Sequence, residues 1–187
     1  MCHNGIMDLN FIFSQIFCSI ALLFVCLGYF TKDKTKFFIF QIIANPFYGL
    51  SYIFLGSYVA GILSIISTLR CIYLFFCERY NFKYTVIFLF VFVFAYIAID
   101  IVFWKNIYDI IPLLSSIMFT FGFYIKNIQI MRYFLCIPNA LLIIYAILLN
   151  NYVSILLSII ELTVLIIAII KYYLQNAKNQ TPNETNQ

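Results

Sequence analysis

The stretch NPFYGLSYIFLGSYVAGILSIISTLR, Asn45 to Arg70, holds two apolar runs that are separated by the short connection Gly56 to Tyr58. Glycine supplies turn chemistry at such a break. A helix needs about 20 mainly apolar residues to cross the hydrocarbon core of a bilayer, and each run forms part of a segment of that length. The stretch therefore predicts two membrane-spanning helices joined by a tight turn, with Asn45, Pro46 and Arg70 inside them.

The composition of the whole chain agrees with lipid as its solvent. Of 187 residues, 65% are hydrophobic, 20% are aromatic and only 10% are charged. One soluble core cannot bury that much apolar surface. We predict an all-α membrane protein with seven spans, at residues 10–30, 37–55, 58–77, 84–104, 108–125, 131–149 and 152–173.

The basic residues predict the orientation of these spans. With seven spans, the loops 31–36, 78–83 and 126–132 lie on the same side as the C-terminal tail. Of the 11 Lys and Arg residues, only Lys105 falls in an opposite loop, and Arg70 falls inside a span. The positive-inside rule then places the N-terminus outside and the C-terminus in the cytoplasm. The first ten residues contain no Lys or Arg, so we expect the first span to be retained rather than cleaved as a signal peptide.

An internal repeat organises the chain. Residues 11–77 align without a gap on 105–171, at an offset of 94 positions. The matches are Gly28 with Gly122, Lys32 with Lys126, Asn45 with Asn139, Tyr58-Val59 with Tyr152-Val153, and 63–66 with 157–160. Three spans per repeat, with one span between the repeats, give a parallel 3+1+3 arrangement, which transporters use to build a site between two halves.

This arrangement divides the chain into five parts. Residues 1–9 are an extracytoplasmic N-terminus, 10–77 the first three-helix bundle, 84–104 a linker helix and 108–173 the second bundle. We expect the polar residues 174–187 to be a disordered cytoplasmic tail.

Three segments of the chain, the first of which contains the opening stretch, carry a resemblance. FFIFQIIANPFYGLSYIFLGSYVAGILSIISTLRCIYLFF (37–76), together with IIPLLSSIMFTFGFYIKN (110–127) and IYAILLNNYVSILLSIIELTVLIIAIIKYY (144–173), resembles the YgjV-type family of bacterial inner-membrane proteins. The three-span repeat is more distantly similar to the PQ-loop superfamily, which includes the SWEET and SemiSWEET sugar transporters. This second resemblance implies a central cavity for a small solute, with helix prolines as hinges. The Pro-Gln dipeptide that names the superfamily is absent from this chain.

Polar residues inside the spans are the candidate site. Gln41, Asn45, Tyr48 and Tyr52 follow helical spacing and share one face of the second span, and Asn139 repeats Asn45. One interpretation is a pair of asparagines that contacts a solute. The other is hydrogen bonding between helices, a common role of buried asparagine in membranes.

Two charged residues lie within spans. Arg70 and Glu161 occupy related positions in the two repeats, so we expect them to pair across a central cavity, where Arg70 would accept a carboxylate and Glu161 a proton or an amine. The alternatives are that Arg70 extends its guanidinium to the interface and that Glu161 is protonated.

Two further features bear on movement and packing. Pro46 and Pro138 each remove a backbone hydrogen bond from the second helix of a bundle, which suits either a hinge or a static kink. A stripe of small residues on the third span suits close helix packing; its members are Ser57, Gly61, Ser64 and Thr68.

The most consistent function is transport or facilitated passage of a small solute, and the alternative is a non-transporting membrane receptor or assembly protein. No constellation of paired acids, Cys with His, or metal ligands predicts catalysis, a metal or a cofactor. The net charge of +4 follows membrane topology and does not predict nucleic-acid binding. The expected partners are the lipid bilayer and a small solute, and a homo-oligomer is compatible with the sequence.

Overall fold

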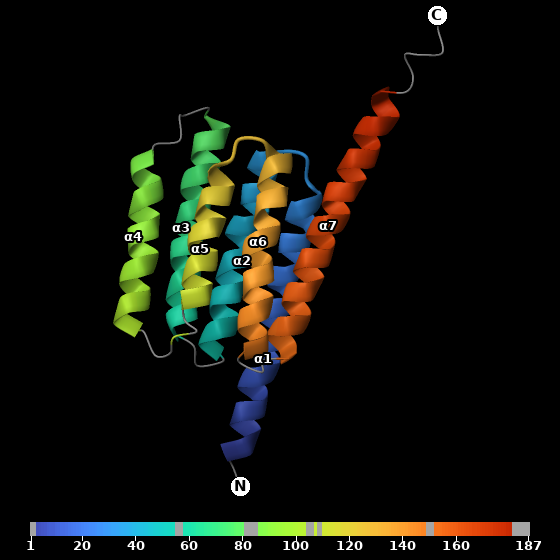
Figure 1. The fold of residues 1–187 in the computed structure, drawn as a ribbon. Helices are drawn as coiled ribbons and strands as arrows, with labels where there is room; N and C mark the ends of the chain where they lie inside the picture. The colour runs from blue at the N-terminus through green and yellow to red at the C-terminus, as the bar shows by residue number, and fades with distance from the viewer. Residues whose placement is uncertain are drawn as a thin grey trace, which may run out of the picture.

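A computed structural model describes residues 3–54, 58–80, 86–103, 107, 110–148 and 152–180 of the chain. The described residues form seven α-helices, and the ribbon in Figure 1 shows them as a single bundle. Their bounds are α1 His3–Phe30, α2 Lys34–Phe54, α3 Tyr58–Arg79, α4 Val86–Phe103, α5 Ile110–Tyr124, α6 Ile128–Leu148 and α7 Tyr152–Gln180.

The prediction of an all-α membrane protein with seven helices is confirmed. Within the described residues, five helices are long and apolar enough to cross a membrane: α1, α2, α3, α6 and α7. The apolar parts of α4 and α5 are shorter, at Ile87–Phe103 and Ile110–Tyr124. At 1.5 Å per residue, the 15 residues of α5 span only about 22 Å.

The ends of the first and last helices differ from the predicted boundaries. Helix α1 begins at His3, before the expected start at residue 10. Helix α7 continues to Gln180, past the expected end at residue 173, so residues 174–180 are helical and the expected disorder there is corrected. No glycine or proline occurs between Tyr152 and Gln180 to end the helix. Residues 181–187 lie outside the described residues.

We refer to α1–α3 and α5–α7 as the two three-helix groups. The middle helix of each group contacts both of its neighbours. Helix α2 packs against α1 and α3, and α6 packs against α5 and α7. The two groups meet where α1 contacts α7, and α4 contacts both α3 and α5. Aromatic rings line the α1–α2 contact: the ring centroid of Phe47 lies 6.1 Å from Phe17 and 6.2 Å from Phe24.

The two ends of the bundle differ in charge. Figure 1 shows the start of α1 and the end of α7 at opposite ends, with the α1–α2 and α5–α6 connections at the end toward which α7 runs. We call this the basic end, because most of the described Lys and Arg residues belong to these connections, to the helix ends beside them, or to α7 where it contacts the end of α1: Lys32, Lys34, Lys36, Arg79, Lys126, Arg132 and Lys171. Lys105 lies outside the described residues.

The first helix of each group ends in the same hydrogen bond. The amide of Thr31 donates to the carbonyl of Gly28 at 3.1 Å, and the amide of Ile125 donates to the carbonyl of Gly122, also at 3.1 Å. Both residues of the second pair lie 94 positions after those of the first. The offset found in the sequence therefore also relates two turns that contain the same hydrogen bond.

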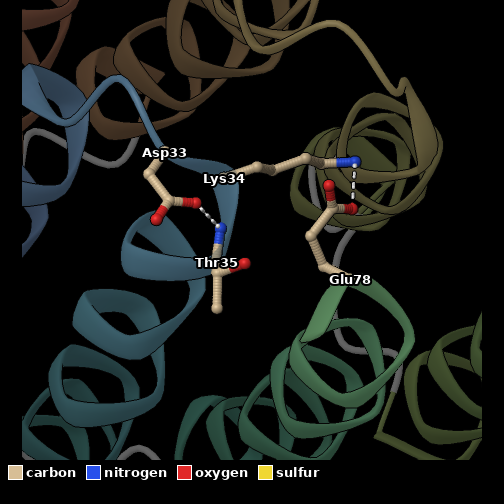
Figure 2. A network of polar contacts seen from close by, with 4 residues as sticks. All are labelled: Asp33, Lys34, Thr35 and Glu78. Atoms are coloured by element: carbon tan, nitrogen blue, oxygen red, sulfur yellow. Dashed lines mark hydrogen bonds and ion pairs between the residues drawn. The ribbon is translucent and has the colours of Figure 1, made fainter. Parts of the chain in front are cut away.

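The second helix of each group also begins in the same way. The Asp33 carboxylate accepts the amide of Thr35 at 2.9 Å, as Figure 2 shows, and the Asn127 side-chain oxygen accepts the amide of Gln129 at 2.8 Å. Asp and Asn are preferred helix N-caps because they satisfy amides that the first turn leaves free. These caps are related by the same offset of 94, although the residue type differs.

An ion pair connects two helices at the basic end. Lys34 Nζ lies 3.7 Å from Glu78 Oε2, so the start of α2 is tied to the end of α3 (Figure 2). Lys34 also lies over the ring of Phe38, 5.5 Å from its centroid. The charge of Lys34 is thus compensated within the bundle.

The small-residue stripe lies where α2 and α3 approach closely. A Cβ built on Gly49 would lie 3.2 Å from Ser64 Cβ and 3.7 Å from the Gly61 carbonyl oxygen. Thr68 donates to the Ser64 carbonyl within α3 at 2.8 Å. This geometry agrees with the predicted packing role of Gly61, Ser64 and Thr68, while Ser57 lies outside the described residues.

Candidate functional site

The polar face predicted on α2 is directed partly inward. Gln41 is 7% exposed, and Asn45 and Tyr48 are half-buried. Tyr52, one turn beyond Tyr48, is 37% exposed and reaches the surface. The face thus runs from the interior near the middle of α2 to the edge of the bundle.

A hydrogen bond between Tyr48 and Glu161 is the main polar contact of the interior. The Tyr48 hydroxyl donates to Glu161 Oε1, and both side chains are half-buried. This contact joins α2 of the first group to α7 of the second. A carboxyl group at this depth requires such a partner, because a central Asp or Glu is costly in hydrocarbon.

A second polar contact lies on the neighbouring part of α2. The hydroxyls of Ser14 and Ser51 are 3.0 Å apart and link α1 to α2. Both side chains are buried, at 0% and 2% exposure. Hydrogen bonds between hydroxyl groups of neighbouring helices are typical of membrane bundles, so Ser14 and Ser51 are explained by helix packing.

The repeat-related asparagines have different environments. The Asn45 side-chain amide donates to Cys71 Sγ at 3.6 Å, which links α2 to α3. Asn139 is fully buried, and its amide donates to the Leu135 carbonyl of its own helix at 2.9 Å. Its side-chain oxygen has no hydrogen-bond partner among the described residues. The two amides therefore make different hydrogen bonds in this structure, and their role in contacting a solute stays a prediction.

The two helix prolines also differ. Pro46 lies on the exposed side of α2, whereas Pro138 is fully buried in α6. The hydroxyl of Ser115 on α5 donates to the Pro138 carbonyl at 2.9 Å. Both helices continue through their prolines, and the hinge role of each stays a prediction.

Arg70 is held by the side chains of α4 and α5. It is 4% exposed, and its Nη1 donates to Thr120 Oγ1 at 2.7 Å. The guanidinium carbon lies 4.8 Å from the ring centroid of Phe123 and 5.6 Å from that of Tyr96. Tyr96 in turn shares a 2.8 Å hydrogen bond with Ser67, one turn before Arg70 on α3.

The hydroxyl of Thr120 is oriented to receive Arg70. It donates to the carbonyl of Ser116 at 2.8 Å, which leaves its oxygen lone pairs for the guanidinium. Arg70 Nε, by contrast, has no hydrogen-bond partner among the described residues. A buried guanidinium with a free donor is suited to an anionic group, since that group would satisfy both charge and hydrogen bonding.

Arg70 and Glu161, which the sequence predicts to pair, have different partners in the structure. Glu161 bonds Tyr48 and Arg70 bonds Thr120, and no ion pair connects Arg70 to Glu161 within the described chain. The guanidinium is also buried rather than extended to the interface. We call Tyr48 and Glu161 the carboxyl site, and Arg70, Thr120, Phe123 and Tyr96 the guanidinium site.

Three residues with defined contacts were missed by the sequence analysis. Thr120 and Tyr96 stand out only as polar groups in apolar segments, which is a weak signal. The sequence predicts Arg132 at the end of the loop 126–132, but in the structure it lies in α6 and is only 2% exposed. Among the residues described, no group of three His, Cys, Asp or Glu side chains could hold a metal ion.

Comparison with known proteins gives one result. Residues 12–176 match the model of the Imp-YgjV family, described as bacterial inner membrane protein. Neither the curated proteins nor the solved structures give a match. Since the family model covers most of the chain, the protein belongs to the Imp-YgjV family of bacterial inner membrane proteins.

Proposed function

We propose that this membrane protein moves a small solute between its two three-helix groups. The observation that carries the proposal is that Glu161 and Arg70 each reach from one group into the other. Glu161 on α7 meets Tyr48 on α2, and Arg70 on α3 meets Thr120 on α5. Movement of one group against the other would break both contacts, and a bound solute would replace them.

The related turns support a parallel 3+1+3 repeat. The ends of α1 and α5, and the caps of α2 and α6, carry the same hydrogen bonds at an offset of 94. Two parallel repeats are a common way to build a transport path between halves. In this proposal the basic end faces the cytoplasm, following the positive-inside rule.

The chemistry of the two sites favours a solute with an acidic group. Arg70 would bind a carboxylate through its free Nε, and Glu161 would bind an amine or a proton after releasing Tyr48. Organic acids and amino acids are therefore the first solutes to test. Asn45, Asn139 and Gln41 would contribute neutral hydrogen-bonding groups along the route.

One observation favours the alternative, a receptor or assembly protein that does not transport. Tyr48, Glu161, Asn45 and Arg70 each already have a partner on another helix. Such bonds are sufficient to explain polar residues in a membrane bundle as packing elements.

A ligand screen distinguishes the two functions. Purified protein in an uncharged detergent is heated with organic acids, amino acids or sugars, since a ligand that binds only the folded state raises the melting temperature. We expect a shift with one class of solute, lost in Arg70→Gln or Glu161→Gln and kept in the control Lys36→Gln, whose side chain is exposed. Uptake of the same solute into proteoliposomes then tests transport. If no solute shifts the wild type and both interior variants keep its melting temperature, the transport proposal is wrong.

A further inference from the structure

A small basic pocket at the basic end of the bundle is not used by the proposed transport path. It lies between the end of α1, the first turns of α6 and the C-terminal part of α7, and its volume is about 100 Å³. The residues that define its chemistry are Phe30, Lys32, Arg132, Lys171, Tyr172 and Gln175. Three of these side chains are cationic, and none is acidic.

Arg132 forms the fixed wall of this pocket. It is 2% exposed, and its Nη2 donates to the backbone carbonyl of Thr31, so the guanidinium is held against the end of α1. Its Nε has no hydrogen-bond partner within the described part of the chain. A buried charged donor without a partner is unfavourable unless a ligand satisfies it.

The charge of the pocket is not compensated by an ion pair among the described residues. Lys34, at the same end, pairs with Glu78, as seen in Figure 2. No such ion pair is formed by Lys32, Arg132 or Lys171 with any described residue. Lys171 is held over the ring of Phe30, with Nζ 5.6 Å from the centroid, which directs its ammonium group toward the end of α1.

The pocket is large enough for a small anionic group. Its volume of about 100 Å³ has room for a phosphate group. Arginine and lysine together supply the charge and the hydrogen bonds that a phosphate prefers.

An apolar depression adjoins the pocket on the outer face of α7. Its volume is about 410 Å³, and it is lined by Ile167, Ile170 and Leu174 together with Lys171 and Gln175. Lys171 and Gln175 also line the basic pocket, so the two hollows lie side by side. Ile167, Ile170 and Leu174 are 47%, 52% and 61% exposed, which places this face toward lipid.

We propose that this composite site binds one anionic phospholipid, with its phosphate in the pocket of Lys32, Arg132 and Lys171 and an acyl chain on the apolar face of α7. Basic pockets at the ends of membrane helices are suited to anionic headgroups. The apolar face beside the cations selects a lipid over a soluble phosphate. The site does not depend on the proposed transport function.

The test measures lipid binding to the full-length protein in an uncharged detergent at 0.15 M salt. Native mass spectrometry with phosphatidylglycerol, and with phosphatidylcholine as the neutral comparison, gives the affinity of the first bound lipid. The variant Lys32→Gln/Lys171→Gln is compared with Lys36→Gln/Lys126→Gln, which removes the same charge from exposed residues at the same end. We expect one phosphatidylglycerol to bind the wild type, with affinity roughly 25-fold lower in the pocket variant, about fivefold per lysine, and little changed in the control.

Three outcomes would overturn the proposal. Equal binding of phosphatidylcholine would show that the headgroup charge is not recognised. An equal loss of affinity in the control variant would assign the effect to the general charge of the basic end. A melting-temperature increase with inorganic phosphate that matches the one with phosphatidylglycerol would identify a soluble anion as the ligand.

Discussion

Removing the hydroxyl of Tyr48 tests whether the carboxyl site holds the two three-helix groups together. Tyr48→Phe deletes only the group that donates to Glu161 Oε1 and keeps the ring. Hydrogen bonds to charged groups contribute about 1.5–3 kcal/mol in soluble proteins, but bonds between membrane helices average about 0.6 and reach about 1.7 kcal/mol. Both residues are only half-buried, so we expect the free energy of unfolding to fall by about 1 kcal/mol.

The assay is a double-mutant cycle of Tyr48→Phe and Glu161→Gln, measured by reversible unfolding in mixed detergent micelles. If the contact is formed, the two changes are not additive, and the interaction energy is about 0.6–1.7 kcal/mol. Tyr133→Phe serves as the control, because Tyr133 is 55% exposed and its change should stay within about 0.5 kcal/mol. Additivity within about 0.3–0.5 kcal/mol would refute the contact between Tyr48 and Glu161.

Three further substitutions test other parts of the fold by the same unfolding measurement. Thr120→Val removes the hydroxyl oxygen that accepts from Arg70 Nη1 at 2.7 Å, and it should lower the free energy of unfolding by about 1–3 kcal/mol. An unchanged free energy of unfolding would mean that the guanidinium has another acceptor. Gly49→Ala places a Cβ 3.2 Å from Ser64 Cβ, which cannot move without the backbone, so the free energy of unfolding should fall by about 1–3 kcal/mol. In Gly122→Ala the new Cβ meets the side chains of Leu135 and Phe134, which can rotate away, so the loss should be smaller. A larger loss at Gly122 than at Gly49 would contradict this reasoning. Asp33→Ala removes the N-cap of α2 and should lower the free energy of unfolding by about 0.5–2 kcal/mol. Asp33→Asn should keep the stability of the wild type, because Asn127 caps α6 in the same way. A loss of stability in Asp33→Asn as large as in Asp33→Ala would argue against the cap.

The sequence alone determined the helices and their approximate limits. Long apolar segments that lipid must cover become helices, because every backbone amide and carbonyl has to be satisfied within the segment. The sequence predicts that α3 begins at Tyr58, as the structure has it. The polar composition of residues 174–180 predicts disorder, yet no glycine or proline stops the helix before Gln180.

The residue matches at an offset of 94 were also visible in the sequence, but the matching helix caps were not. The matched Gly28 and Gly122 mark the two related turns. The related caps Asp33 and Asn127 differ in residue type, so simple identity did not reveal them. Their equivalence depends on a shared side-chain oxygen that accepts the same backbone amide.

The partners of the interior polar residues were decided by tertiary structure. Sequence spacing placed Arg70 and Glu161 at related positions, yet the rotation of each helix about its axis directs Arg70 to Thr120 and Glu161 to Tyr48. Arg132 likewise became a buried pocket residue only through its contact with the end of α1, a hundred residues earlier in the chain. Local apolar patterns determine where a helix forms, because its backbone bonds are local. Which side chains meet depends on packing between distant segments, and no single segment contains that information.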